Sequence, residues 1–466
     1  MEEVKNKESN TPNRSIWQNF KSTYKYAKRG KKYLWIFLII NVFMTIISVI
    51  APILAAQRLL ALTSNNYSKL LVFILLIFGI EILRNFCNLA YSYTYNKFYY
   101  DARKNLQLEL IRETLRITQK DLNNNSSGVF IERINGDTDN LTDIFTILID
   151  YITDLIGNLG ILVTVFFINF YLGLLYIFVI IIFFLYNKFS SNINYENRKK
   201  YKKSREKTGG FISEIVRGSK DIKILDAEES FLIKANDYIK ETNNISYHQD
   251  KTRSLLRLLG GSIRDMGDLI VSVFIFIFLS LGSLRIESAI IIYNYHGRII
   301  SLSGSIERIF EIIKQFNLAA NRIFGILEED EFTKEHFGSK KLKKFEGNIS
   351  FKDVYFAYEK DLPVLKGMNF KVNANETVGF VGPSGAGKST IFNLISAIER
   401  VDKGLITFDG VDINTLDKSS IRGNLSVISQ NAYIFNMSIL DNLKVIKKDA
   451  TEEEIKDACH LACLDD

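Results

Sequence analysis

The sequence contains little cysteine and little proline. Its 466 residues include three cysteines (Cys87, Cys459 and Cys463) and four prolines, which disfavours a disulfide-stapled scaffold and a proline-rich linker. About thirty polar and basic residues precede the first apolar run without a small-residue cleavage site, so we expect no removable signal. The net charge of +7 is small, and Lys and Arg recur in blocks between apolar runs. This pattern suggests membrane topology, not a nucleic acid partner.

Long apolar runs fill the first two thirds of the chain. The run at residues 34–56 has the roughly twenty residues that a helix needs to cross a hydrocarbon core about 30 Å thick. A helix over residues 144–189 is too long for one crossing, and the only turn-like break inside it is NFYLG at residues 169–173. We therefore predict spans at residues 34–56, at 70–93, on either side of this break, at 262–284 and, despite its polar residues, at 286–306.

The stretch VGPSGAGKST at residues 381–390 has the pattern of a phosphate-binding loop. It contains G-x-x-x-x-G-K-S between an apolar strand-like run and a helical one, which is the context that this motif requires. Its glycines let backbone N–H groups turn toward phosphates, and the next helix adds its positive dipole end. We expect Lys388 to reach the β- and γ-phosphates of ATP, and Ser389 to coordinate Mg²⁺. The expected nucleotide-binding residues of the loop are Gly382, Pro383, Ser384, Gly385, Ala386, Gly387, Lys388, Ser389 and Thr390.

Basic residues determine the predicted topology. Nine Lys and Arg precede the first span, and the segments at residues 97–133 and 188–257 are also basic, which places all three in the cytoplasm by the positive-inside tendency. Because ATP is cytosolic, a phosphate-binding C-terminal region requires an even number of crossings. The polar sixth segment, which contains His296 and Arg298, is therefore needed, and its polarity suits a helix that lines a water-filled path.

The sequences around the phosphate loop match a known family in order. Residues 349–372 alternate as two strands do and include Tyr358, and GLITFDG and VISQNAYIFNMSILDN, with Gln430, follow the loop. As an ordered set, these motifs resemble those of a half-transporter of the ATP-binding cassette (ABC) exporter family. The resemblance implies that Tyr358 stacks on adenine and that Gln430 contacts Mg²⁺ and the attacking water. The alternatives are a cross-strand aromatic for Tyr358 and an ordinary strand-end polar residue for Gln430.

The membrane half resembles the same family more loosely. SSGVFIERINGDTDNL and GGFISEIVRGSKDIKILDAEESF look like its two intracellular loops, whose short coupling helices dock on nucleotide domains, and ANRIFGILEE looks like the start of its linker. The resemblance implies an all-α six-helix transmembrane domain and an α/β P-loop (RecA-like) nucleotide-binding domain, incomplete at its C-terminus. The expected parts are a basic segment with an interfacial helix at residues 1–33, the transmembrane domain at 34–325, a linker at 326–346 and the partial nucleotide domain at 347–466.

Several catalytic motifs of the family do not occur in these residues. There is no LSGGQ-like signature, no apolar run ending in Asp-Glu (the Walker B strand) and no later switch histidine. LACLDD at residues 461–466 imitates the acidic strand, but the apolar residues around it have the i, i+3, i+4 spacing of a helix. Asp409 lies too close to the phosphate loop to be the acidic residue and is expected in a turn. We therefore expect the chain not to hydrolyse ATP alone.

The resemblance implies ATP-dependent export, with ATP and Mg²⁺ as cofactors. We expect a multi-pass protein of the cytoplasmic membrane, with both termini in the cytoplasm, that pairs with a second half-transporter as a homodimer or heterodimer. The substrate is a drug, a lipid or a peptide. The alternative is a truncated or nucleotide-sensing membrane protein that binds ATP without hydrolysing it.

Ionisable residues at membrane depth form a further group of candidates. Charges there are costly unless they pair or face water. Glu81 and Arg84 stand at i, i+3 and can satisfy each other. Asp154 and Asp268 have no such local partner, so either one binds a cationic substrate or pairs across helices with Arg298.

Overall fold

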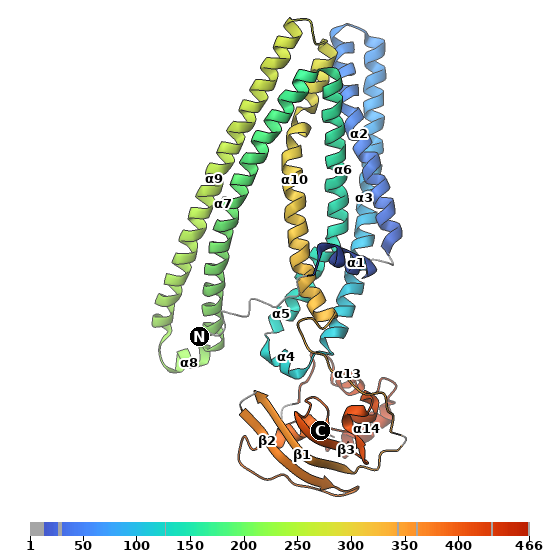
Figure 1. Ribbon diagram of the computed structural model, residues 1–466, viewed down its shortest axis with the longest axis vertical. Helices are drawn as coiled ribbons and strands as arrows, with labels where there is room; N and C mark the ends of the chain where they lie inside the picture. Colours follow the sequence, from blue (N-terminus) through green and yellow to red (C-terminus); the bar gives the residue numbers. More distant parts are fainter. Residues whose placement is uncertain are drawn as a thin grey trace. The chain divides into compact units, whose positions relative to one another are not determined.

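The computed structural model describes residues 14–26, 30–125, 127–342, 344–359, 362–429 and 432–464. The chain divides into two compact units, the first formed by Met1–Arg116 with Ser126–Phe332 and the second by Ile117–Asn125 with Thr333–Asp466. Figure 1 shows that the first unit is built of long helices and that the second contains the sheet. The predicted site residue Gln430 lies outside the described residues.

Six helices of 31 residues or more occur in the described ranges of the first unit. They are α2 (Lys31–Thr63), α3 (Tyr67–Thr114), α6 (Thr138–Ile168), α7 (Phe170–Arg217), α9 (Glu228–Ser280) and α10 (Ile286–Leu327). Within the described residues, four stretches are long and apolar enough to cross a membrane: α2, α3, α7 and the stretch Ser127–Ile168 that ends with α6. Polar and charged residues such as Asp268 and Arg298 interrupt the apolar runs of α9 and α10, so the count of six spans stays a prediction.

The predicted break between the third and fourth helices is confirmed. Helix α6 ends at Ile168 and α7 begins at Phe170, and between them the extended residue Asn169 caps α7 by accepting a hydrogen bond from the Leu172 amide at 3.1 Å. Asparagine is favoured at this position because its side-chain oxygen satisfies an amide that has no partner within the helix. Beyond the cap, buried residues of α7 such as Tyr176 and Val179 pack in one core with α6, α9 and α10.

Short helices lie in both segments that resemble intracellular loops. SSGVFIERINGDTDNL contains α5 (Ser127–Glu132), which follows α4 (Gln119–Asn124), and GGFISEIVRGSKDIKILDAEESF contains α8 (Ser219–Ile224). A π-helical turn, η3 (Arg133–Asp137), joins α5 to α6. Near the N-terminus, α1 (Ile16–Tyr26) packs on α10, where the buried Asn19 amide donates to Asn317 and Asn321 at 2.6 and 2.9 Å.

The second unit contains a four-stranded antiparallel sheet in the order β2-β1-β3-β4. The two strands predicted in residues 349–372 are confirmed as β1 (Ile349–Glu359) and β2 (Leu362–Val372), and β3 (Lys403–Phe408) and β4 (Val411–Asp412) follow. Helix α11 (Lys388–Ile395) contributes Ile391 and Leu394 to the core of this unit. The remaining elements are η4 (Ile413–Thr415), α12 (Lys418–Arg422), α13 (Ile439–Lys444) and α14 (Glu452–Leu461).

The strand predicted immediately before the phosphate loop does not form in this structure. Residues 377–381 are not in a strand and belong to no ladder of the described residues, and Val381 is 99% exposed. The apolar stretch at residues 425–429 is likewise unpaired, with Ile428 95% exposed. A strand needs a neighbour to satisfy its backbone groups. The apolar composition of these segments therefore favours strands, but neither segment pairs with another strand of the described residues. The helical interpretation of the stretch before LACLDD is confirmed by α14.

Candidate functional site

The phosphate loop leads directly into α11. Gly385 and Gly387 have φ of +83° and +85°, a backbone region that residues with a Cβ rarely adopt. Gly387 also lies against β2, because a Cβ there would stand 2.9 Å from Leu365 Cδ2 and 3.1 Å from Val364 Cγ1. The loop is tightened further by a hydrogen bond from the Ala386 amide to the Pro383 carbonyl at 3.2 Å. Two of the predicted glycines are thus required by conformation, and one of them also by packing.

Lys388 is the first residue of α11 and folds back over the loop. Its ammonium donates to the carbonyl oxygens of Gly382 and Pro383, both at 2.8 Å. The next residue, Ser389, is exposed, and Thr390 is buried. A cation at a helix N-terminus, beside a glycine-rich turn and an exposed hydroxyl, is an arrangement suited to phosphate and Mg²⁺.

Tyr358 lies beside the first turn of α11, although many residues separate the two in the sequence. Its hydroxyl is 3.4 Å from Thr390 Oγ1 and accepts a hydrogen bond from the Asn393 amide at 3.2 Å. The ring packs edge-on against Phe356 at 4.8 Å and remains 38% exposed. The structure therefore brings the predicted aromatic residue to the predicted loop, with part of its surface open for stacking.

Asp409 is a turn residue, as the sequence suggested. It has a φ of +46° between β3 and β4, and its carboxylate accepts hydrogen bonds from the amides of Glu346, Gly347 and Asn348 at 2.8 to 3.4 Å. Burial raises the pKa of Asp409, but the hydrogen bonds from Asn348 and Glu346 outweigh it and hold the pKa below its usual value. Its role in this structure is to close the turn.

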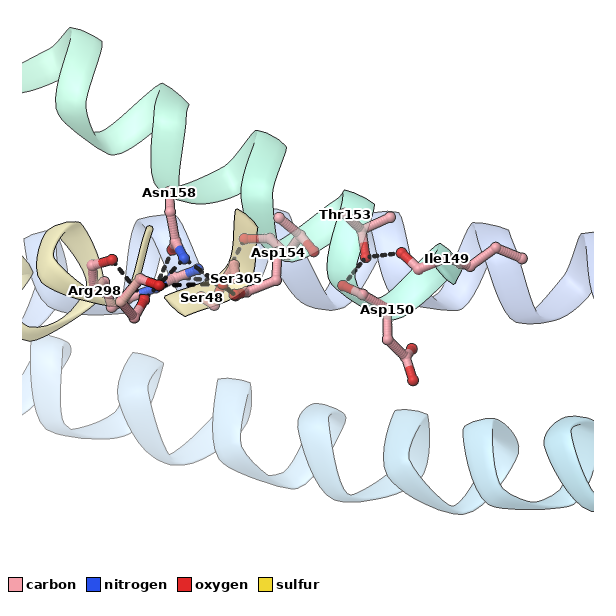
Figure 2. A network of polar contacts seen from close by, with 10 residues as sticks. Ser48, Ile149, Asp150, Thr153, Asp154, Asn158, Arg298 and Ser305 are labelled. Carbon is pink, nitrogen blue, oxygen red and sulfur yellow. Dashed lines mark hydrogen bonds and ion pairs between the residues drawn. The ribbon is translucent and has the colours of Figure 1, made fainter. Parts of the chain in front are cut away.

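A polar network in the first unit pairs two of the ionisable candidates (Figure 2). Arg298 of α10 donates to Ser48 Oγ of α2 at 2.7 Å and to Asn158 Oδ1 of α6 at 2.9 Å. The Arg298 guanidinium also lies 3.6 Å from the carboxylate of Asp154, which in turn accepts from the Asn158 amide at 3.1 Å. The geometry favours interhelical pairing for Asp154.

Asp268 has a different partner from the one considered at the sequence level. Its carboxylate contacts His296 Nε2, while His296 Nδ1 lies 3.1 Å from the Tyr176 hydroxyl. This chain of contacts joins α9, α10 and α7.

The local pair predicted from spacing is also present, with Arg84 and Glu81 3.3 Å apart.

The sequence did not reveal a ladder of tyrosine–aspartate pairs between α3 and α6. Its three hydrogen bonds measure 2.7 to 2.9 Å: Tyr91 to Asp150, Tyr95 to Asp143 and Tyr99 to Asp139. The sequence contains one indication of this ladder: the three tyrosines are spaced at i, i+4 and i+8, which puts them on one helix face.

Comparison with known proteins agrees with both halves of the chain. The family model for the ABC transporter transmembrane region matches residues 34–296, and the ABC transporter model matches residues 365–465.

Individual relatives match parts of this chain. The uncharacterized ABC transporter ATP-binding protein YfiC of Bacillus subtilis is 24% identical over 72% of this chain and 56% of its own length. The ATP-dependent lipid A-core flippase of Francisella novicida is 28% identical over 72% of this chain and 57% of its own. The multidrug resistance protein pgp-1 of Caenorhabditis elegans is 39% identical over 31% of this chain and 11% of its own. The chain thus spans little more than half the length of the first two relatives. With a membrane-domain model that covers most of its helices and a nucleotide-domain model after it, the chain belongs to the ABC transporter family.

Proposed function

We propose that this chain is one half of an ATP-driven exporter that moves a drug, a lipid or a peptide across the cytoplasmic membrane. The observation that carries this proposal is the meeting of Tyr358, Thr390 and Lys388 at the start of α11, in the same chain as helices apolar enough to cross a membrane. Relatives named as a lipid A-core flippase and a multidrug resistance protein support the export of amphipathic molecules.

In the proposed nucleotide site, the chain's own residues bind and orient ATP. The backbone N–H groups of residues 382 and 384–390 surround the phosphates, and Lys388 exchanges its bonds to the Gly382 and Pro383 carbonyls for charge-assisted bonds to the β- and γ-phosphates. Ser389, exposed at the helix start, provides an oxygen ligand for Mg²⁺. Tyr358 stacks on the adenine, and Gln430 contacts Mg²⁺ and orients the attacking water. Mg²⁺, when held there, would neutralise charge that develops on the phosphates during hydrolysis.

The partner in this proposal is a second half-transporter. Helix α8, at the end of the α7–α9 pair, ends in exposed apolar side chains, with Ile224 exposed to 70% and the capping residue Leu225 to 73%. Exposed apolar groups gathered at one tip commonly mark an interaction surface. We propose that this tip acts as a coupling helix and docks on a nucleotide domain of the dimer.

The proposed architecture includes six spans, with both termini in the cytoplasm. The basic segments on the N-terminal side of α2 and within α3 and α7 support this orientation. The proposed domains are a transmembrane domain at residues 34–325, a linker at 326–346 and a P-loop nucleotide domain from 347.

Nucleotide binding tests the assignment of the loop directly. In the full chain, Lys388→Ala should weaken the binding of a fluorescent ATP analogue by at least about tenfold, because a single charged hydrogen bond contributes about 1.5–3 kcal/mol. Lys371→Ala, which removes an exposed ammonium from β2, is the matched control and should bind normally. Equal affinities for the two variants would contradict the assignment. Binding by the wild type without hydrolysis in the assembled dimer would favour the alternative of a nucleotide-sensing membrane protein.

A further inference from the structure

A cavity of about 730 Å³ lies among α7, α9 and α10 of the first unit. Tyr186 and Asn187 of α7, Arg257 and Arg264 of α9, and Gly297 and Ser301 of α10 are among the residues that line it. This volume lies within the range of sites for drug-sized ligands, about 300–1,000 Å³. We propose that the cavity binds an anionic amphiphile, a lipid-like molecule with an acidic phosphate or carboxylate headgroup and a hydrocarbon chain. The proposal rests on the export function proposed above and specifies its substrate class.

The positive charge of the cavity comes from one stripe of α9. Arg253, Arg257 and Arg264 stand at i, i+4 and i+11, a spacing that places them on the same helix face, and all three line the cavity. Arg253 has a carboxylate partner in Asp250 at 3.4 Å, whereas Arg257 donates to the neutral Ser254 hydroxyl at 3.2 Å. Among the described residues, neither Arg257 nor Arg264 takes part in an ion pair. Two guanidinium groups are therefore free for an acidic ligand, which arginine can bind in a bidentate manner.

The acidic residue that lines the cavity and the nearby Asp154 are each paired with a basic residue of the protein. Asp268, the only acid among the described lining residues, contacts His296. Asp154 does not line the cavity and lies 3.6 Å from Arg298. The lining residues of α7 carry no charge, and those of α10 add only His296. The cavity is thus net positive, which favours an anionic ligand over the cationic substrate considered from the sequence.

Glycines make room in the cavity. A Cβ at Gly261, Gly297 or Gly304 would meet no atom within 4 Å, so these positions border open space. On α10, Gly297, Ser301 and Gly304 stand at i, i+4 and i+7, so the helix face that lines the cavity carries small side chains or none at these positions. Small residues here keep the cavity open without being required by the packing of the helices.

The same cavity also offers an apolar wall. Phe183, Leu256 and Ile300 line it from the three helices with 5%, 6% and 7% of their surface exposed, so each offers only an edge to a hydrocarbon chain. Arg253 and Arg257 precede the predicted fifth span and Arg264 stands near its start, at the level expected for headgroups of the cytoplasmic leaflet. Asp268 lies about 6 Å further along α9 at ~1.5 Å per residue. Cations at the headgroup level with an apolar wall beside them match an acidic lipid.

The first experiment removes the charge. The full chain in detergent is titrated with a fluorescent short-chain phosphatidylglycerol and with the matching phosphatidylcholine. We expect the wild type to bind phosphatidylglycerol at least about tenfold more tightly. The double variant Arg257→Gln/Arg264→Gln should lose this preference. The control Lys251→Gln removes one positive charge from α9 at an exposed position that does not line the cavity, and it should keep the preference.

A second variant removes the space and leaves the arginines in place. Gly304→Leu places a side chain where nothing lies within 4 Å, and leucine is a better helix former than glycine, so the fold should persist with an unchanged circular dichroism spectrum. Phosphatidylglycerol binding should fall at least about tenfold. Unchanged binding in this variant would contradict the cavity as the site.

Three other results would overturn the proposal. One is equal affinity for the two lipids in the wild type. Another is displacement of phosphatidylglycerol by the cation tetraphenylphosphonium. The third is displacement by inorganic phosphate at the same concentration as by unlabelled phosphatidylglycerol, since the site would then recognise a free anion and not an amphiphile.

Binding of the ATP analogue in the same samples separates the two proposals. If it depends on Lys388 while the lipid preference is absent, only the substrate class is wrong. If it does not depend on Lys388, the proposed function fails, whatever the lipid result.

Discussion

The pairing of Asp154 with Arg298 makes a quantitative prediction about stability. Two unit charges 3.6 Å apart attract each other by about 1 kcal/mol in bulk water and by about 5 kcal/mol at an effective dielectric constant of about 20. Because the Asp154 side chain is 48% exposed in the protein, we expect Asp154→Asn to cost about 1–2 kcal/mol, toward the lower limit. Arg298→Gln should cost more, about 2–4 kcal/mol, because it also removes the donor to Ser48 and Asn158.

A double-mutant cycle measures the coupling between the two residues. Unfolding of the purified chain in mixed micelles gives the free energy of unfolding for the wild type, both single variants and the double variant. We expect the double variant to be about 1–2 kcal/mol more stable than the sum of the single effects predicts. The exposed pair Glu81 and Arg84 is the control, and its coupling should not exceed about 0.5 kcal/mol. Additive effects of Asp154→Asn and Arg298→Gln would refute the pairing. So would a neutral effect of Asp154→Asn on stability combined with a changed preference for cationic substrates.

Three further perturbations test other parts of the structure. Gly387→Ala should destabilise the chain more than Gly410→Ala in thermal unfolding, because both residues have positive φ but only at Gly387 does a Cβ meet β2; equal losses would mean that backbone strain alone matters. Asp409 has a lowered pKa, so its stabilisation is present above the unfolded pKa of about 3.9 and is lost as pH falls through the folded pKa. The melting temperature of the wild type should therefore fall more steeply than that of Asp409→Asn as the pH drops below about 4, and parallel curves would contradict this. For topology, a cysteine introduced at Asn65 should react with an impermeant reagent from outside intact cells and one at Asn124 should not, and labelling at Asn124 would overturn the orientation.

Local features were predictable from the sequence because neighbouring residues determine them. Asn169 ends one helix and caps the next with its own side chain, and the loop before Lys388 needs left-handed glycines wherever it occurs. The order of motifs in a family indicated Tyr358, and the structure places it beside α11, but its stacking on adenine stays a prediction.

Contacts between distant helices were harder to predict. Which side chain faces Asp268 depends on the rotation of α10 against α9, so His296 and not Arg298 became its partner. The regular spacing of the tyrosines in α3 is visible in the sequence. No neighbouring residue, however, indicates that the aspartates of α6 accept their hydrogen bonds. Residues 377–381 have the composition of a strand, yet a strand also needs a neighbour, which lies elsewhere in the sequence.

ATP-dependent uptake into inverted membrane vesicles tests the central claim, that the phosphate loop drives movement through the helices of the same chain. The measurement follows a fluorescent phosphatidylglycerol and the cation ethidium in vesicles that contain the assembled dimer. Wild-type vesicles should transport at least one of the two when ATP and Mg²⁺ are added, Lys371→Ala vesicles should behave like the wild type, and Lys388→Ala vesicles should transport neither. Uptake by Lys388→Ala vesicles at the wild-type rate would contradict the account.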